Sequence, residues 1–178
     1  KLSLIASVVF VAVSLIVICS IYCVGEALEE GGLPEDDSGV AAKYPGDTGI
    51  ENDLDVIFVE DFEKPSLDEM KKRWDEVKNA KIMSFSDDTP LGSAGKCSLL
   101  MTYVGGEGDG GYLYRRLQPG YDKLYTRFYV KFDPQCGTIH HFFHVGGYNP
   151  PTPWPQGGAG QRPRGDDRFS TGVEPYGD

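Results

Sequence analysis

The chain has 178 residues and a formal net charge of -10, with 27 acidic and 17 basic side chains. This length suits one ordinary folded domain with appendages, because single domains commonly contain roughly 100 to 200 residues. The strong negative charge argues against wholesale binding to nucleic acid or to an anionic membrane, since both repel an acidic partner.

An apolar run without charged residues opens the chain at residues 4–24. It is longer than the roughly 7 to 15 residues of a usual signal-peptide core and close to the roughly 20 that span a bilayer. We therefore expect residues 1–27 to form an apolar helix that serves as a signal peptide or as a membrane anchor. The protein would then be secreted, or held at the cell surface, and would contact the membrane only through this segment.

An acidic stretch rich in Gly and Pro follows at residues 28–54, with few large aliphatic side chains. Such a segment cannot bury enough apolar surface to become ordered, so we expect a disordered linker. The folded domain is therefore expected at residues 55–178.

That domain is predicted to begin with a short apolar strand at 55–63 and a short helix within 65–77. Ser66 is a favourable N-cap for the helix, and Glu69 follows three residues later, as in a capping box. Three apolar side chains recur at helical spacing and should form its buried face: Leu67, Met70 and Trp74.

The remainder of the domain is predicted to consist of short strands separated by turn residues. The expected strand segments are 80–86, 96–104, 111–117, 123–133, 138–146 and 168–177. Strands at this spacing indicate an all-β fold, an antiparallel β-sandwich or jelly roll, and no helical period supports an α/β fold. A sandwich of this type usually has several more strands, so we expect the domain at 55–178 to be incomplete.

Three of these segments combine an apolar face with a face of aromatic and basic residues, because strand side chains alternate. In 123–133 the predicted core residues are Leu124, Thr126, Phe128, Val130 and Phe132. The opposite face carries Tyr125, Arg127, Tyr129 and Lys131. Comparable faces contain Tyr112, Tyr114 and Arg116, or His140 and His144, whereas His141 falls with the apolar set and is expected in the core.

A concave sheet lined in this way suits a polysaccharide. Aromatic rings stack on the apolar faces of sugars, and Arg and Lys bind hydroxyl and carboxylate groups. Between Tyr112 and Arg168 eight basic residues face four acidic ones, which favours an acidic ligand. The expected substrate-binding residues are Tyr112, Tyr114, Arg116, Tyr125, Lys131 and Trp154, the last in a long loop rich in Gly and Pro.

The same side chains could cleave a uronate-containing chain by β-elimination. That reaction needs a group that neutralises the carboxylate, a base that removes the adjacent proton, and an acid that protonates the leaving oxygen. The candidates for these roles, in the same order, are Arg127 or Arg116, His140 or His144, and Tyr129 or Tyr125.

No metal or other cofactor is expected at these residues. His140 and His144 share a strand face, but four residues of strand separate them by roughly 13 Å, too far for one metal ion. A calcium site is the alternative, since the adjacent carboxylates of Asp166 and Asp167 are hard oxygen ligands. Adjacent acids in a loop more often pair with neighbouring arginines.

Cys97 and Cys136 are a disulfide candidate, because an exported domain keeps paired cysteines oxidised. Two buried thiols are the alternative, since the sequence does not supply the geometry that a disulfide requires.

Two quoted segments carry a family resemblance: "DVIFVEDFE" at the start of the domain, and "LYTRFYVKFDPQCGTIHHFFHVGGY" with the Gly-rich stretch after it. Together they resemble the concanavalin A-like lectin and glucanase superfamily, and within it the secreted jelly-roll polysaccharide lyases of the alginate and glucuronan type. In such lyases a Tyr, a basic side chain and sometimes a His act on a concave sheet. The resemblance, which covers 55–178, implies these roles for Tyr129, Arg127, Lys131 and His140 or His144.

These features predict an extracytoplasmic protein that binds an acidic, uronate-containing polysaccharide and, if it is an enzyme, cleaves that chain by β-elimination. Two alternatives stay open: a non-catalytic, lectin-like glycan-binding module, and a structural sandwich domain at the cell surface. Nucleic acid is not an expected partner.

Overall fold

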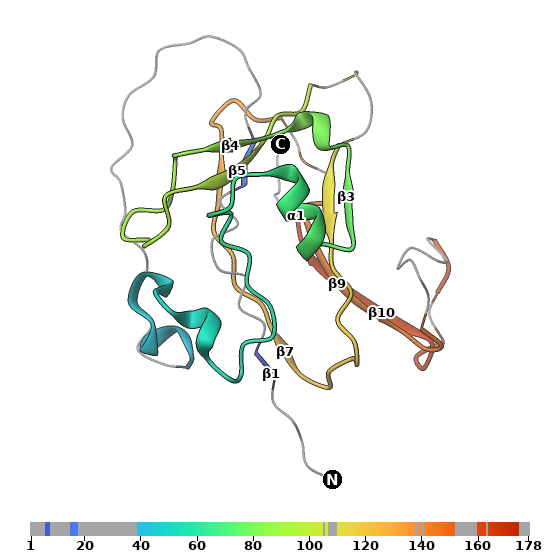
Figure 1. Cartoon of the computed structure of the whole chain (residues 1–178). Helices are drawn as coiled ribbons and strands as arrows, with labels where there is room; N and C mark the ends of the chain where they lie inside the picture. Colours follow the sequence, from blue (N-terminus) through green and yellow to red (C-terminus); the bar gives the residue numbers. More distant parts are fainter. Residues whose placement is uncertain are drawn as a thin grey trace. The chain divides into compact units, whose positions relative to one another are not determined.

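The computed structural model describes residues 6–7, 15–17, 39–104, 106, 110–137, 139, 141–151, 160–162 and 164–174. The chain divides into two compact units, unit 1 (Lys1–Gln135) and unit 2 (Cys136–Asp178), which we describe separately. Short strands in small sheets make up most of the described secondary structure, together with one α-helix and short 3-10 helices (Figure 1).

The strands of unit 1 are short: all eight described strands have between two and four residues, and each belongs to one of three sheets. Their bounds are β1 Ala6–Ser7, β2 Leu15–Val17, β3 Glu76–Lys78, β4 Met83–Ser86, β5 Ser98–Met101, β6 Tyr112–Tyr114, β7 Leu124–Tyr125 and β8 Val130–Phe132. The largest sheet has the order β4-β5-β2-β8, while β3 pairs with β6 and β1 with β7. Apart from 55–63, the predicted strand segments of unit 1 therefore contain strands, each shorter than expected.

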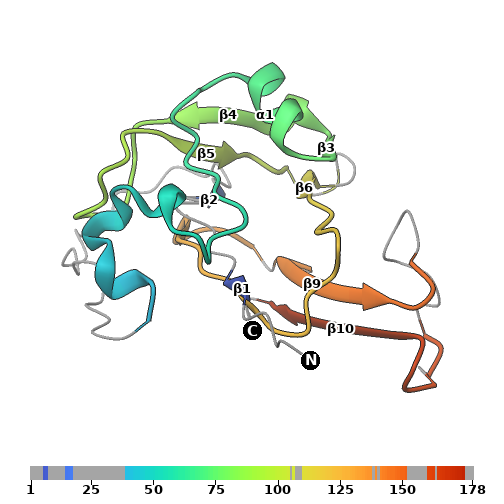
Figure 2. The same cartoon turned by 60° about the horizontal axis from the view of Figure 1, so that its bottom comes forward.

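The helix α1, Leu67–Arg73, is confirmed together with its cap. The Ser66 side chain accepts a hydrogen bond from the Glu69 backbone N–H at 3.5 Å, as the capping pattern predicts. Met70 is fully buried and Trp74 is 7 % exposed, so the predicted apolar face is the buried one. Both views show α1 beside β3 and β4 (Figures 1 and 2).

The main core of unit 1 lies between α1 and the antiparallel pair β4–β5. Met83 stands opposite Met101 in this pair, and Phe85 stands opposite Leu99. Met83, Leu99 and Met101 are buried and pack in one cluster with the apolar face of α1. A β-sandwich would need a second long sheet packed on this core. The other described sheets of unit 1 have only two strands each, so the fold is β-rich but is not shown to be a sandwich.

The predicted disordered linker is wrong for its described part, residues 39–54. Three 3-10 helices occupy it: η1 Ala41–Lys43, η2 Pro45–Asp47 and η3 Ile50–Asn52. Ile50 is fully buried in a second cluster that includes Tyr44, Val56 and Tyr129. Gly46 has φ 61°, and a Cβ there would lie 2.5 Å from the Gly92 carbonyl oxygen, so a close approach of two chain segments requires this glycine. Tertiary burial of one aliphatic side chain thus orders an acidic segment.

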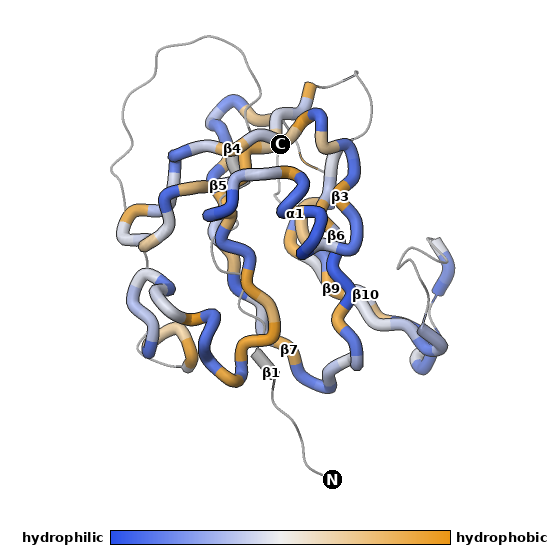
Figure 3. Tube along the Cα trace, viewed as in Figure 1, coloured by the Kyte–Doolittle hydropathy of each residue, from blue (hydrophilic) through white to orange (hydrophobic). Residues whose placement is uncertain are grey.

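The predicted strand at 55–63 is also wrong, although its alternating pattern of burial is present. Phe58, Glu60 and Phe62 are buried, while Asp61 and Glu63 are exposed. The only ladder contact is an isolated bridge at Val56. Side-chain carboxylates accept the backbone donors instead, since the Phe62 N–H binds Glu60 and the Glu63 N–H binds Asp61. Figure 3 shows the start of this stretch as a hydrophobic length of chain.

Unit 2 is built on a β-hairpin of β9 Phe143–Tyr148 and β10 Arg168–Val173. The pairing is antiparallel over six residue pairs, from Arg168 opposite Tyr148 to Val173 opposite Phe143. Figure 2 shows the two strands side by side. Both predicted segments therefore contain a strand, but the first begins later than expected, because His141 has φ 63° and leaves the extended conformation.

The expected N-terminal apolar helix lies mostly outside the described residues. Its described parts, residues 6–7 and 15–17, are strands: β1 pairs parallel with β7, and β2 pairs parallel with β5 and β8. The helix prediction is wrong for these five residues, where open strand edges supply the backbone partners. Among the described residues, none of the helices combines the length and the apolarity that crossing a bilayer needs.

Candidate functional site

The predicted polar face of residues 123–133 is not a continuous strand face. The segment forms β7 and β8 with four intervening residues that are not in a strand. Within these four residues, Arg127 makes an ion pair with Asp47, whose side chain is only 4 % exposed, and its guanidinium lies 5.4 Å from the ring centroid of Tyr129. Arg127 therefore pairs with a buried carboxylate of its own chain. Its guanidinium is thus already engaged and is poorly placed to neutralise a substrate carboxylate, the role predicted for it.

The other members of that face have separate surroundings. Tyr129 packs against the Ile50 cluster. Lys131 Nζ donates to Asp88 Oδ2 at 2.9 Å. Tyr125 is 50 % exposed, and the Lys123 ammonium lies 4.9 Å from its ring centroid. Of these predicted residues, Tyr125 is the one whose aromatic ring is open to a ligand.

The predicted binding residues of β6 contact the neighbouring strand β3. Tyr112 and Tyr114 are half-buried and stand opposite Lys78 and Glu76. The Tyr112 hydroxyl donates to Glu76 Oε1 at 3.0 Å. Burial, together with this carboxylate, raises the pKa of Tyr112 to about 12. These two tyrosines therefore contribute to the packing of the β3–β6 sheet. The phenol of Tyr112 stays protonated over the whole physiological pH range.

A solvent-open hollow of about 450 Å³ lies on unit 1, and none of the residues of the predicted face lines it. Its lining combines a run of apolar residues with three cations and one acid: Val56, Ile57, Phe58, Val59, Lys72, Arg73, Arg115 and Glu51. The apolar run comes from the extended segment after η3, and two of the cations come from the last turn of α1. The helix thus supplies basic side chains next to an apolar wall.

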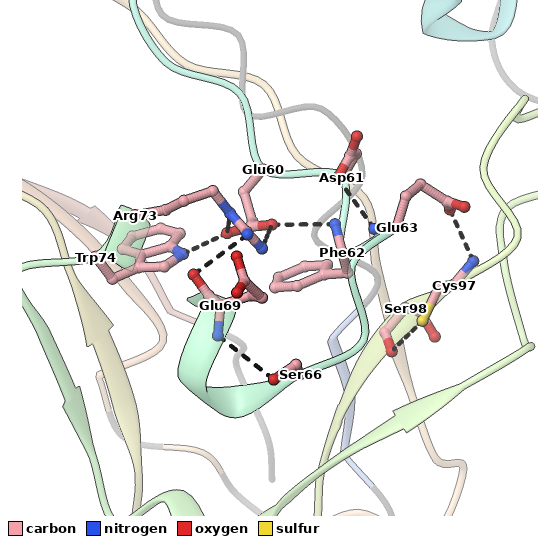
Figure 4. A network of polar contacts seen from close by, with 10 residues as sticks. All are labelled: Glu60, Asp61, Phe62, Glu63, Ser66, Glu69, Arg73, Trp74, Cys97 and Ser98. Carbon is pink, nitrogen blue, oxygen red and sulfur yellow. Dashed lines mark hydrogen bonds and ion pairs between the residues drawn. The ribbon is translucent and has the colours of Figure 1, made fainter. Parts of the chain in front are cut away.

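The three cations of the hollow differ in how far they are already bound. Arg73 Nε and Nη2 donate to the buried Glu60 carboxylate at 2.9 and 2.7 Å, and Nη1 donates to the Glu69 carbonyl oxygen. The Trp74 indole N–H also donates to Glu60, at 2.8 Å (Figure 4). The hydrogen bonds to Glu60 raise the pKa of Arg73. Arg73 is therefore a structural cation.

Lys72 and Arg115 keep donor groups toward solvent. The Lys72 side chain is 68 % exposed and pairs with Glu69 on the same helix. Arg115 is exposed and places its guanidinium 5.2 Å from the Phe58 ring centroid. Its Nη1 donates to the Arg73 carbonyl oxygen at 2.9 Å and lies 3.6 Å from Asp75 Oδ2. A flat guanidinium held in this way retains N–H groups for a carboxylate ligand.

A second cluster, which we call the His–Glu cluster, lies on unit 2 and contains His141, His144 and Glu174. His141 Nδ1 is 2.7 Å from Glu174 Oε1, and His144 Nε2 is 3.3 Å from the same oxygen. The side chains are 57 %, 41 % and 43 % exposed, in the order His141, His144, Glu174. The prediction that His141 is a core histidine is wrong, because the turn at His141 directs its ring to the carboxylate that follows β10.

Several other predicted residues are placed as follows. Arg116 has an exposed side chain, and its backbone N–H donates to Asp75 at 2.8 Å. His140 and Trp154 lie outside the described residues. Asp167 accepts the Arg164 backbone N–H at 2.9 Å, and its pKa is lowered by this bond and by nearby arginines although burial works to raise it. The Asp167 carboxylate therefore pairs with a neighbouring arginine, Arg164, as expected for adjacent acids in a loop.

The disulfide candidates, Cys97 and Cys136, are half-buried thiols that lie on different units. Cys97 Sγ lies 3.9 Å from the Ser98 carbonyl oxygen, and Cys136 Sγ lies 3.4 Å from the Gly137 carbonyl oxygen. Burial raises the pKa of the Cys97 thiol, and the nearby Glu63 carboxylate adds to the effect. Cys97 is thus a poor nucleophile at neutral pH.

Comparison with family models, curated proteins and solved structures finds no match to this chain. The candidate sites are therefore judged from geometry alone. Sequence reasoning missed the hollow, and of the three residues of the His–Glu cluster it named only His144 as a site residue. The basic pair at the end of α1 was a visible signal for the hollow, but nothing local connects His141 with Glu174, which are 33 residues apart.

Proposed function

We propose that the protein is an extracytoplasmic glycan-binding module that holds an acidic polysaccharide at the hollow of unit 1. One observation carries this proposal: Lys72 and Arg115, both exposed, flank an apolar wall in one open hollow. Uronate carboxylates would pair with the two cations, and sugar C–H groups would lie against the apolar wall. An open hollow also suits a chain ligand that continues past the site at both ends.

Binding is preferred to cleavage because Arg127, suggested for β-elimination, is engaged by a buried carboxylate, whereas Lys72 and Arg115 have only exposed carboxylate partners, Glu69 and Asp75. Arg127 holds Asp47, Lys131 holds Asp88 and Tyr129 packs against Ile50. A lectin-like glycan-binding module thus fits these contacts better than a polysaccharide lyase does. A concanavalin A-like jelly roll remains our proposal for the finer architecture of the all-β fold, and secretion or surface anchoring our proposal for location.

The test compares the purified full chain with alginate, with glucuronan and with a neutral glucan, using calorimetry or affinity electrophoresis. We expect binding to the two polyuronates and none to the neutral glucan, and the affinity should fall with added salt. The double variant Lys72→Gln/Arg115→Gln should lose about tenfold or more in affinity, since a tenfold loss corresponds to only about 1.4 kcal/mol.

A matched control is the double variant Lys64→Gln/Lys81→Gln. It removes the same charge from two exposed lysines that do not line the hollow. Equal losses in the two double variants would show a diffuse charge effect and contradict a site at the hollow. Absence of polyuronate binding by the unaltered chain would contradict the function itself, and release of unsaturated uronate products would establish a lyase in its place.

A further inference from the structure

The His–Glu cluster of unit 2 brings together three groups that bind transition metals. Each of His141, His144 and Glu174 offers one ligand atom, and the three atoms lie within 4.8 Å of one another. Imidazole nitrogen with carboxylate oxygen is a ligand set suited to Zn²⁺ and similar dications, whereas Ca²⁺ and Mg²⁺ prefer oxygen ligands alone. The ligand types therefore select the class of metal.

The spacing of the cluster is close to that of a tetrahedral site. Zinc binds nitrogen and oxygen at about 2.0 to 2.2 Å, so two ligand atoms of a tetrahedral site lie about 3.3 to 3.6 Å apart. The distance from His144 Nε2 to Glu174 Oε1 is 3.3 Å, which matches that edge. The His141 Nδ1 to Glu174 Oε1 distance is 2.7 Å, so a metal would need this pair to separate by less than an ångström or so.

The backbone around the cluster places the two rings next to each other. His141 has φ 63°, which a histidine adopts at a local energetic cost, and β9 begins two residues later. The ring centroids of His141 and His144 lie 5.2 Å apart as a result. Gly172 stands opposite His144, and a Cβ there would lie 2.7 Å from the Phe143 carbonyl oxygen and 3.0 Å from the imidazole. The glycine leaves room for that ring.

From these contacts we propose that His141, His144 and Glu174 form a binding site for a transition-metal dication of the Zn²⁺ type. The site has three protein ligands on an exposed surface, so its fourth position faces water, as in zinc sites that bind an external ligand. It stands independently of the glycan proposal, because it uses different residues on a different unit.

The experiment measures Zn²⁺ binding to the chelator-treated full chain by calorimetry at neutral pH, and Co²⁺ binding by its visible absorption. We expect one equivalent of Zn²⁺ and the intense visible bands of four-coordinate Co²⁺. His144→Ala and Glu174→Gln should each weaken Zn²⁺ binding by at least about tenfold, which is the lower end for loss of metal-site partners. Because these side chains are exposed, the far-UV circular dichroism should not change.

Controls separate this site from the other metal-binding groups of the chain. His140→Ala removes a neighbouring histidine that is not one of the three proposed ligands, and Cys97→Ser/Cys136→Ser removes both thiols. Both variants should keep the affinity of the unaltered chain. Gly172→Ala retains all three ligands but crowds His144, and it should weaken binding without abolishing it.

Three results would overturn the site: equal affinity in His144→Ala and the unaltered chain, a loss in His140→Ala as large as in His144→Ala, or binding that disappears with the thiols. Polyuronate binding measured on the same variants distinguishes the two proposals. It should be unchanged in His144→Ala, whatever happens to Zn²⁺ affinity.

Discussion

Glu60 of unit 1 and Glu174 of unit 2 are both carboxylates with nitrogen partners, yet they differ in burial. Glu60 is fully buried and accepts hydrogen bonds from Arg73, Trp74 and the Phe62 backbone. Glu174 is 43 % exposed and lies against two histidines. A buried carboxylate must keep all its partners, because leaving one side uncompensated costs several kcal/mol. An exposed one can exchange a partner for a ligand at little cost.

Removal of the buried carboxylate should have the largest effect. Glu60→Ala leaves the Arg73 guanidinium and the Trp74 N–H without their acceptor, so we expect the free energy of unfolding to fall by about 3 to 5 kcal/mol. Glu174→Ala should cost less than about 1 kcal/mol, because exposed ion pairs contribute little. Urea denaturation followed by circular dichroism measures both. Similar losses in the two variants would remove the distinction drawn between the two carboxylates.

The turns before Glu60 form the second buried cluster of unit 1, and Ile50 tests its contribution. Ile50→Ala should lower the free energy of unfolding by about 2 to 5 kcal/mol, because the side chain is fully buried in its cluster. Leu54→Ala is the matched control, since Leu54 is 99 % exposed and should change stability by less than about 0.5 kcal/mol. If residues 39–54 were a disordered linker, both substitutions would be neutral in urea denaturation.

The N-cap of α1 positions Arg73 for Glu60 only through the helix, so its removal should be milder. Ser66→Ala loses the acceptor for the Glu69 N–H, and we expect a destabilisation of about 1 kcal/mol. Ser66→Asp retains an acceptor and should preserve stability. Thermal unfolding of the two variants provides the measurement, and equal melting temperatures would show that this long hydrogen bond contributes nothing.

Alkaline titration tests a local effect that is confined to high pH, at Tyr112. Its pKa of about 12 exceeds the ordinary value of 10, so the folded state binds this proton more tightly than the unfolded state does. The associated stability is complete below about pH 10 and is lost as the pH rises toward 12. Tyrosinate absorbance of the unaltered chain should therefore contain a late-titrating component, and Tyr112→Phe should lack it. A variant that instead loses a component near pH 10 would contradict the buried, Glu76-bonded phenol.

Features that depend on neighbouring residues were predictable from sequence. The N-cap at Ser66, the buried face of α1 and the positions of most strands follow from local hydrogen bonding and side-chain period. The polar face of 123–133 was predicted by the same alternation, but four non-strand residues between β7 and β8 interrupt it. The alternation of side chains along a strand could not reveal that Arg127 forms an ion pair with Asp47, which lies in the segment predicted to be disordered.

The sequence by itself thus determined the local elements of this protein: a capped helix, a series of short strands and the acidic character of the chain. Tertiary structure alone decided which charged groups became buried or gathered into sites. Glu60 binds Arg73 and Trp74, which are 13 and 14 residues away in the sequence. His141 contacts Glu174, which is 33 residues away. Such pairs depend on where distant segments pass one another and on how much water remains there, and neither is encoded in the spacing of neighbouring residues.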